Sequence, residues 1–130
     1  MSGSDANPSL EGRRVLIVED EYFIADDMAQ ALRDMGAEVL GPAPNRTRAA
    51  AIIAADGQID FAVLDINLAG EPVFPIADLL SDRGVPFVFA TGYDESALPA
   101  DYRDALRWEK PFNPEDLART LPLLLETQTA

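Results

Sequence analysis

The sequence predicts an α/β fold, in which a parallel five-stranded sheet is covered by helices on both faces. Short apolar runs, typical of strands that are buried on both faces, recur along the 130 residues. Segments with helical periodicity lie between these runs, and glycine or proline marks the junctions. This alternation implies βαβ units with right-handed crossovers. The expected product is a flavodoxin-like (βα)5 doubly wound sheet with strand order 2-1-3-4-5.

The predicted strands are apolar runs that end at polar residues. We expect them at residues 13–18, 38–41, 60–65, 86–90 and 106–109. The first run is Val15-Leu16-Ile17-Val18, and the third is Phe61-Ala62-Val63-Leu64. Neither run alternates with polar residues, so both faces of these strands should be buried.

Helices are predicted between the strands, at residues 21–35, 45–55 and 73–82. The first has an apolar face formed by Ile24, Met28, Ala31, Leu32 and Met35, and Gly36 is suited to end it. Asn45 is the expected N-cap of the second helix. Pro72 and Pro75 fit only the first turn of the third.

The last part of the chain gives weaker helical signals. Residues 94–104 are expected to form a weak helix, because Pro99 interrupts scattered apolar residues. Asn113 and Pro114 begin a final helix, which Pro122 should kink or end. On composition, residues 1–12 form a disordered tail, residues 13–126 the domain and residues 127–130 a short C-terminal tail.

Charge and composition exclude several classes of function. The chain has 10 basic and 23 acidic residues, a net charge of −13, which argues against binding nucleic acid or an anionic membrane. It has no cysteine and no histidine, so thiol chemistry, histidine-based catalysis and histidine-rich zinc sites are absent. Without a signal peptide or an apolar stretch of about 18 residues, a cytoplasmic protein is expected. The high negative charge favours a monomer.

Polar residues follow the predicted strands at the ends that should share one edge of the sheet. Glu19 and Asp20 follow the first strand, Asp65 ends the third, Thr91 follows the fourth and Lys110 follows the fifth. In open parallel sheets ligands bind at this edge. Three carboxylates, a hydroxyl and an amine gathered there suit a hard cation and a phosphoryl group.

These residues, in this order and at these intervals, resemble the receiver domains of two-component response regulators, over residues 13–126. The match includes the segment Lys110-Pro111-Phe112. Residues 86–93 read PFVFATGY and look like the signature of the "FAT GUY" receiver subclass. That subclass occurs in alphaproteobacteria, often as stand-alone receivers, with histidine kinases of the HWE and related types and with general stress signalling.

The resemblance implies a role for each residue of the site. Asp65 would be the phosphoacceptor, forming an aspartyl phosphate, with Thr91 and Lys110 contacting the phosphoryl group. The carboxylates of Glu19, Asp20 and Asp65 and the backbone carbonyl of Asn67 would hold Mg²⁺. Tyr93 lies where receivers tune the lifetime of the phosphate, and the Lys110–Pro111 bond would be cis.

The resemblance implies the function of a single-domain response regulator. A histidine kinase would phosphorylate Asp65 in the presence of Mg²⁺. The signal would leave by protein–protein contact or by onward transfer to a histidine phosphotransfer protein, because no output domain is expected after residue 126. The chain would take part in its own phosphorylation and dephosphorylation, but it would not be an enzyme.

Each residue also has an ordinary structural interpretation. Asp65 fits a solvated strand end, Glu19 the positive end of a helix dipole, Lys110 the surface, Thr91 a turn and Tyr93 a loop.

Three other functions are alternatives to the phosphoacceptor. Arg107 occupies the position where many receivers have a switching aromatic residue, which keeps open a pseudo-receiver that never takes phosphate. A haloacid-dehalogenase-type phosphohydrolase would need Asp where Asn67 stands. Flavin binding would need a glycine-rich loop where the acidic Glu19-Asp20-Glu21 stands.

Overall fold

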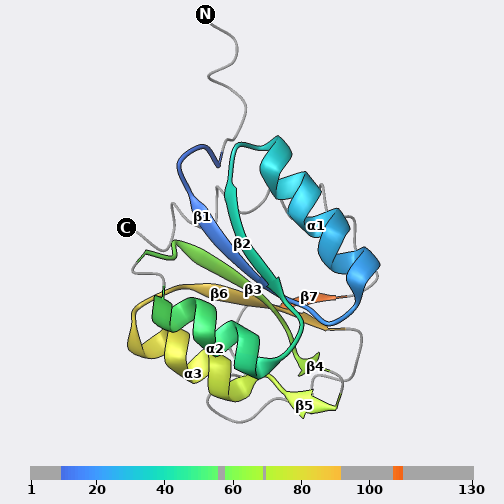
Figure 1. Ribbon diagram of the computed structural model, residues 1–130, viewed down its shortest axis with the longest axis vertical. Helices are drawn as coiled ribbons and strands as arrows, with labels where there is room; N and C mark the ends of the chain where they lie inside the picture. The colour runs from blue at the N-terminus through green and yellow to red at the C-terminus, as the bar shows by residue number, and fades with distance from the viewer. Residues whose placement is uncertain (1–9, 56–57, 69, 92–106, 110–130) are drawn as a thin grey trace, which may run out of the picture.

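A computed structural model describes residues 10–55, 58–68, 70–91 and 107–109 of the chain. The order of elements along these residues is visible in Figure 1. The elements are β1 (Arg14–Val18), α1 (Tyr22–Asp34), β2 (Glu38–Ala43), α2 (Arg46–Ala55), β3 (Phe61–Asp65), β4 (Asn67–Leu68), β5 (Glu71–Pro72), α3 (Phe74–Asp82), β6 (Phe87–Thr91) and β7 (Arg107–Glu109).

The main sheet has the predicted topology. Within the described residues its strands lie in the order β2-β1-β3-β6-β7, and every neighbouring pair is parallel. Since β6 and β7 are the fourth and fifth strands of this sheet along the chain, the expected order 2-1-3-4-5 is confirmed. The α/β doubly wound class is confirmed with it.

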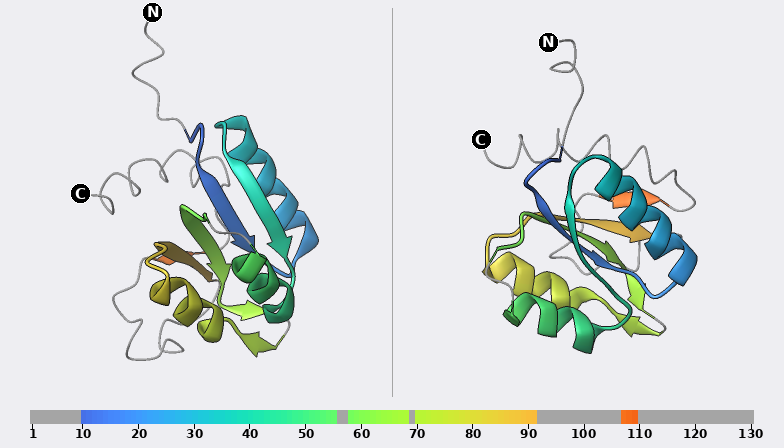
Figure 2. Two further views of the ribbon diagram at one scale, coloured as in Figure 1. Left: turned by 60° about the vertical axis from the view of Figure 1, so that its left-hand side comes forward. Right: turned by 45° about the horizontal axis from the view of Figure 1, so that its top comes forward.

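Both faces of the sheet are covered, as the unbroken apolar runs predicted. Helix α1 lies on one side of the sheet, and α2 and α3 lie together on the other (Figures 1 and 2). Alternate residues of each strand contact different layers: Val15 and Ile17 pack with α1, whereas Leu16 and Val18 pack with α2 and α3. Side chains of β3 divide in the same way. All of these strand residues are fully buried.

The second strand is longer than predicted. It continues through Pro42 to Ala43, whereas the sequence suggested an end at Gly41. Proline is tolerated here because β2 is the edge strand of the sheet, where a missing backbone donor leaves no ladder bond unmade. Gly41 has a φ of +90°, and an added Cβ would lie 2.7 Å from the Ala43 nitrogen, so only glycine fits.

A small hairpin between β3 and α3 was not predicted. Strands β4 and β5 form a two-stranded antiparallel sheet, with Gly70 at a φ of +92° in the turn. Pro72 therefore lies in β5, and only Pro75 stands in the first turn of α3; the prediction for Pro72 was wrong. Strands of two residues are too short to leave an alternating pattern in the sequence.

The segment assigned to the N-terminal tail begins to pack before residue 13. Leu10 is fully buried in the core beneath α1, and its backbone N–H donates to the Met35 carbonyl at 2.9 Å. The tail assignment is therefore wrong for this residue. A single apolar residue among polar ones carries no periodic signal, so composition alone could not place it.

The helix ends follow the expected chemistry where they are described. The Asn45 side chain accepts a hydrogen bond from the Arg48 backbone N–H at 2.8 Å, which confirms it as the cap of α2. Gly36 follows α1 with a φ of +97°, as a helix stop requires. The predicted helices at 94–104 and from Asn113, with Pro122, lie outside the described residues.

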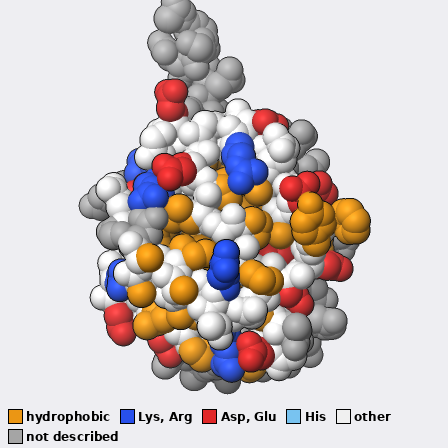
Figure 3. All heavy atoms as spheres, viewed as in Figure 1, with side chains coloured by type: hydrophobic (Ala, Val, Ile, Leu, Met, Phe, Trp, Pro, Cys, Tyr) orange, Lys and Arg blue, Asp and Glu red, His pale blue; other side chains and the backbone are white. Residues whose placement is uncertain are grey.

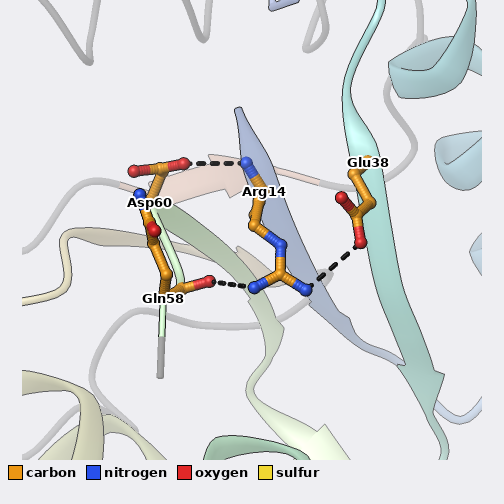
Figure 4. A network of polar contacts seen from close by, with 4 residues as sticks. All are labelled: Arg14, Glu38, Gln58 and Asp60. Atoms are coloured by element: carbon orange, nitrogen blue, oxygen red, sulfur yellow. Dashed lines mark hydrogen bonds and ion pairs between the residues drawn. The ribbon is translucent and has the colours of Figure 1, made fainter. Parts of the chain in front are cut away.

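Arg14 joins three segments at the end of the sheet where the strands begin (Figure 4). Its guanidinium donates to the Gln58 carbonyl at 3.0 Å and to the Glu38 carboxylate at 3.2 Å. Its backbone N–H donates to the Asp60 carboxylate at 2.8 Å. These contacts tie β1 to β2 and to the chain entering β3.

We predict that the two acidic partners of Arg14 differ in importance. Asp60→Ala should cost about 1–2 kcal/mol of unfolding free energy, because a partly buried backbone N–H loses its acceptor. Glu38→Ala makes the same change in charge but should cost less than about 1 kcal/mol, because its ion pair is exposed. Urea unfolding followed by circular dichroism measures both. A larger loss for Glu38→Ala would contradict this assignment.

Candidate phosphoacceptor and metal site

The site is built at the edge where β1 and β3 end. These strands are direct neighbours, and Val18 pairs with Leu64 in their register. The next residues along both strands, Glu19-Asp20 and Asp65, therefore emerge together. Carboxylate oxygens of all three lie within 4.8 Å of one another. The structure thus brings together the three carboxylates that the sequence placed at this edge.

The three carboxylates differ in exposure. Glu19 is 2% exposed and Asp65 is 8% exposed, whereas Asp20 faces solvent. The Glu19 backbone N–H donates to the Ala43 carbonyl at 2.9 Å, which ties the loop to the end of β2. Its Oε2 accepts from the Glu21 backbone N–H at 3.2 Å, so the carboxylate turns back over the start of α1. Its Oε1 is buried and accepts no hydrogen bond from the described residues.

The donor set fits a hard divalent cation. Three negative groups at this separation repel one another, and a cation between them relieves the repulsion. All the side-chain ligands are carboxylate oxygens, and two of the three groups are buried. Mg²⁺ prefers oxygen ligands and is usually held by one or two carboxylates, phosphate and water.

Asn67 and Thr91 are placed at the same edge by their backbones. Asn67 begins β4, two residues after Asp65, and the intervening Ile66 N–H donates to the Ala90 carbonyl at 3.3 Å. Thr91 ends β6, immediately after Ala90, which is the register partner of Asp65. The predicted roles of Asn67 in metal binding and of Thr91 in contacting the phosphoryl group both require that these residues lie at this edge.

Strand β7, the fifth strand of the main sheet, contains one further predicted residue, Arg107. Arg107 begins β7 beside Phe89, and Glu109 ends it beside Thr91. Lys110 and Tyr93 lie outside the described residues, as does the Lys110–Pro111 bond. Their predicted roles stay predictions.

An exposed aromatic pair beside the site was missed in the sequence. Tyr22 and Phe23, in the first turn of α1, are 72% and 79% exposed, and their rings meet edge to face at 5.5 Å. Figure 3 shows hydrophobic side chains standing out from the surface over the start of α1, with acidic side chains around them. The available signal was that both residues fall off the apolar face through Ile24 and Met28.

No helix in the described part of the chain is long and apolar enough to cross a membrane.

The chain resembles bacterial signalling proteins, although no family model matches it. It is 38% identical to the sensory transduction protein LytT of Bacillus subtilis, over 83% of this chain and 46% of LytT. It is 32% identical to the phyllosphere-induced regulator PhyR of Methylorubrum extorquens, over 82% of this chain and 41% of PhyR. The chain thus spans about half the length of the curated relatives that it matches.

A solved structure of a single receiver domain indicates the same family. The REC domain of the response regulator PhyR from Erythrobacter litoralis superposes with a TM-score of 0.78 at 30% identity, covering 93% of this chain and 95% of that domain. The parallel sheet, its strand order and the acidic cluster after β1 and β3 agree with this likeness. The chain belongs to the family of response regulator receiver domains.

Proposed function

We propose that the chain is a phosphoacceptor switch in which Asp65 takes a phosphoryl group from a phosphohistidine, with Mg²⁺ bound at the site. The observation that supports this most is the meeting of Glu19, Asp20 and Asp65 within 4.8 Å at the carboxyl edge of the sheet. Three carboxylates that share one small volume, two of them nearly buried, repel one another, and a bound divalent cation would relieve that repulsion.

The proposed transfer divides its tasks among this chain's residues. A carboxylate oxygen of Asp65 attacks phosphorus as the phosphorus–nitrogen bond breaks, and the imidazole leaves with the bonding electron pair. Glu19, Asp20, Asp65 and the Asn67 carbonyl would hold Mg²⁺, which neutralises charge on the phosphoryl oxygens. Thr91 and Lys110 would contact those oxygens. Glu19 and Asp20 need no role in proton transfer, because phosphoryl transfer depends on positioning and on charge stabilisation.

We propose that the phosphoryl group comes from a phosphohistidine that lies outside these 130 residues. The chain has no histidine, and the family implies a sensor kinase as partner. The resemblance of the PFVFATGY segment to the FAT GUY signature would imply an HWE-type kinase and a stress-signalling role. The exposed Tyr22–Phe23 pair and the acidic rim around it suit a donor surface that is apolar and basic. The signal would pass by protein contact or onward phosphotransfer, and the chain would not act as an enzyme.

A pseudo-receiver that binds partners without phosphate is the second candidate. The observation that favours it is Arg107 at the start of β7, where many receivers carry a switching aromatic residue. Beryllofluoride, which mimics a phosphoryl group on aspartate, separates the two candidates.

We expect beryllofluoride with Mg²⁺ to shift the backbone amide NMR signals of Asp20, Asp65 and Thr91 in the wild-type protein. Asp65→Asn should abolish these shifts, because the acceptor oxygen is lost. Asp82→Asn, at the far end of α3, makes the same charge change and should leave them intact. A wild-type protein that binds Mg²⁺ but ignores beryllofluoride would establish the pseudo-receiver instead.

We expect Asp20→Asn to weaken Mg²⁺ binding by about tenfold or more. A carboxylate a few ångströms from a divalent ion contributes about 2 kcal/mol even at the dielectric constant of water. Calorimetric or NMR titration with Mg²⁺ measures the change, with Asp82→Asn as the control of equal charge. An equal effect of both variants would show that general charge, and not ligation, governs binding.

Repulsion among the carboxylates of Glu19, Asp20 and Asp65 should also lower the free energy of unfolding of the metal-free protein. We predict that Asp65→Asn raises the unfolding free energy by about 1 kcal/mol without Mg²⁺, because one repelling charge is removed. Saturating Mg²⁺ should then stabilise the wild type more than the variant, since it binds the native site. Thermal unfolding with and without Mg²⁺ tests this, and equal Mg²⁺ stabilisation of both proteins would contradict it.

A further inference from the structure

We propose that Arg46 is a positioning residue for the phosphoacceptor site and acts through its contacts with the β4–β5 hairpin. The inference rests on the proposed function, because the hairpin contains Asn67, the expected carbonyl ligand of Mg²⁺. Arg46 is the first residue of α2 and belongs to none of the motifs that mark the site. Its guanidinium nevertheless reaches across to the segment that follows Asp65.

Arg46 makes two contacts with the hairpin, and both fall on β5. Its Nε lies 3.5 Å from a carboxylate oxygen of Glu71, and its terminal nitrogen donates to the Pro72 carbonyl at 3.4 Å. Proline has no N–H, so its carbonyl is the polar backbone group it offers. A planar guanidinium has several donors in a fixed arrangement and can contact both groups at once.

The two residues that Arg46 contacts are paired with the strand that follows the acceptor. Pro72 is the register partner of Asn67, and Glu71 is the partner of Leu68. The hairpin has two further anchors: Leu68 is buried in the core beneath α2 and α3, and the Val73 N–H donates to the Ile66 carbonyl at 2.9 Å. A shift of β5 therefore moves Asn67 relative to Asp65.

The arrangement couples a surface contact to a buried site. Leu68 anchors the hairpin by its burial in the core, and Val73 anchors it by its hydrogen bond to Ile66. Arg46 contacts the hairpin from a separate helix. The ion pair is partly exposed, with the two side chains 37% and 49% accessible, so its loss should change the position and mobility of the hairpin without unfolding the domain.

The test compares Arg46→Gln with Arg48→Gln, a matched control on the same helix. Both variants remove one positive charge from the start of α2. The Arg48 interaction with Asn45 uses the Arg48 backbone N–H, so it survives the change. In metal-free protein, Arg46→Gln should speed amide hydrogen exchange of Val73 about three- to fivefold, the range expected for an exposed ion pair. The Ala37 amide, bonded to Leu32 far from the hairpin, serves as the internal reference and should not change.

Mg²⁺ binding gives the second readout. Arg46→Gln should weaken Mg²⁺ binding about threefold relative to Arg48→Gln, with the difference seen at the Asn67 and Leu68 amides. Glu71→Gln should reproduce part of the effect and add little to Arg46→Gln in the double variant, because one contact is removed by either change. Arg46→Lys, which keeps the charge beside Glu71, should restore most of the affinity.

The outcomes separate this inference from the proposed function. Equal effects of Arg46→Gln and Arg48→Gln on Mg²⁺ affinity, or a Val73 exchange rate that does not rise relative to Ala37, would overturn the role of Arg46. Failure of the wild-type protein to respond to beryllofluoride would overturn the phosphoacceptor function, but the exchange measurement in metal-free protein would still report whether Arg46 holds the hairpin.

Discussion

The parallel pairing of β1 with β3 fixes both the centre of the sheet and the position of the acidic site. Their register places Val18 beside Leu64, so the residues that follow both strands emerge at one point of the edge. Both strands are buried on both faces, and a shift of register by one residue would turn every side chain to the opposite layer. The core therefore holds the carboxylates together despite their repulsion.

The same packing explains why charge can gather at this site. Buried strands fix Glu19 and Asp65 where water has little access, and the Ala43 carbonyl and the Glu21 N–H fix the loop between them and α1. Repulsion among the three groups is the physical basis of affinity for a divalent cation, because binding relieves it. The proposed metal site would therefore lower the stability of the metal-free domain.

Much of the fold was predictable because the core strands leave strong local signals. Apolar runs gave the five strands of the main sheet, and helical periodicity with Asn45 and Gly36 gave the described helices to within a residue or two. The errors share a cause: Leu10, the end of β2 and the β4–β5 hairpin depend on contacts with distant residues. Short or isolated segments carry no periodicity of their own.

The class of fold and the chemistry at the strand ends follow from local features of the amino-acid sequence. Strand periodicity and the placement of Glu19, Asp20 and Asp65 are local properties of the chain. Three facts come from the folded arrangement alone. These oxygens lie within 4.8 Å of one another, Glu19 is buried while Asp20 is exposed, and Arg46 contacts the hairpin after Asp65. Those facts depend on strand register and on which helix packs beside which loop. Such long-range contacts leave no local pattern in one sequence.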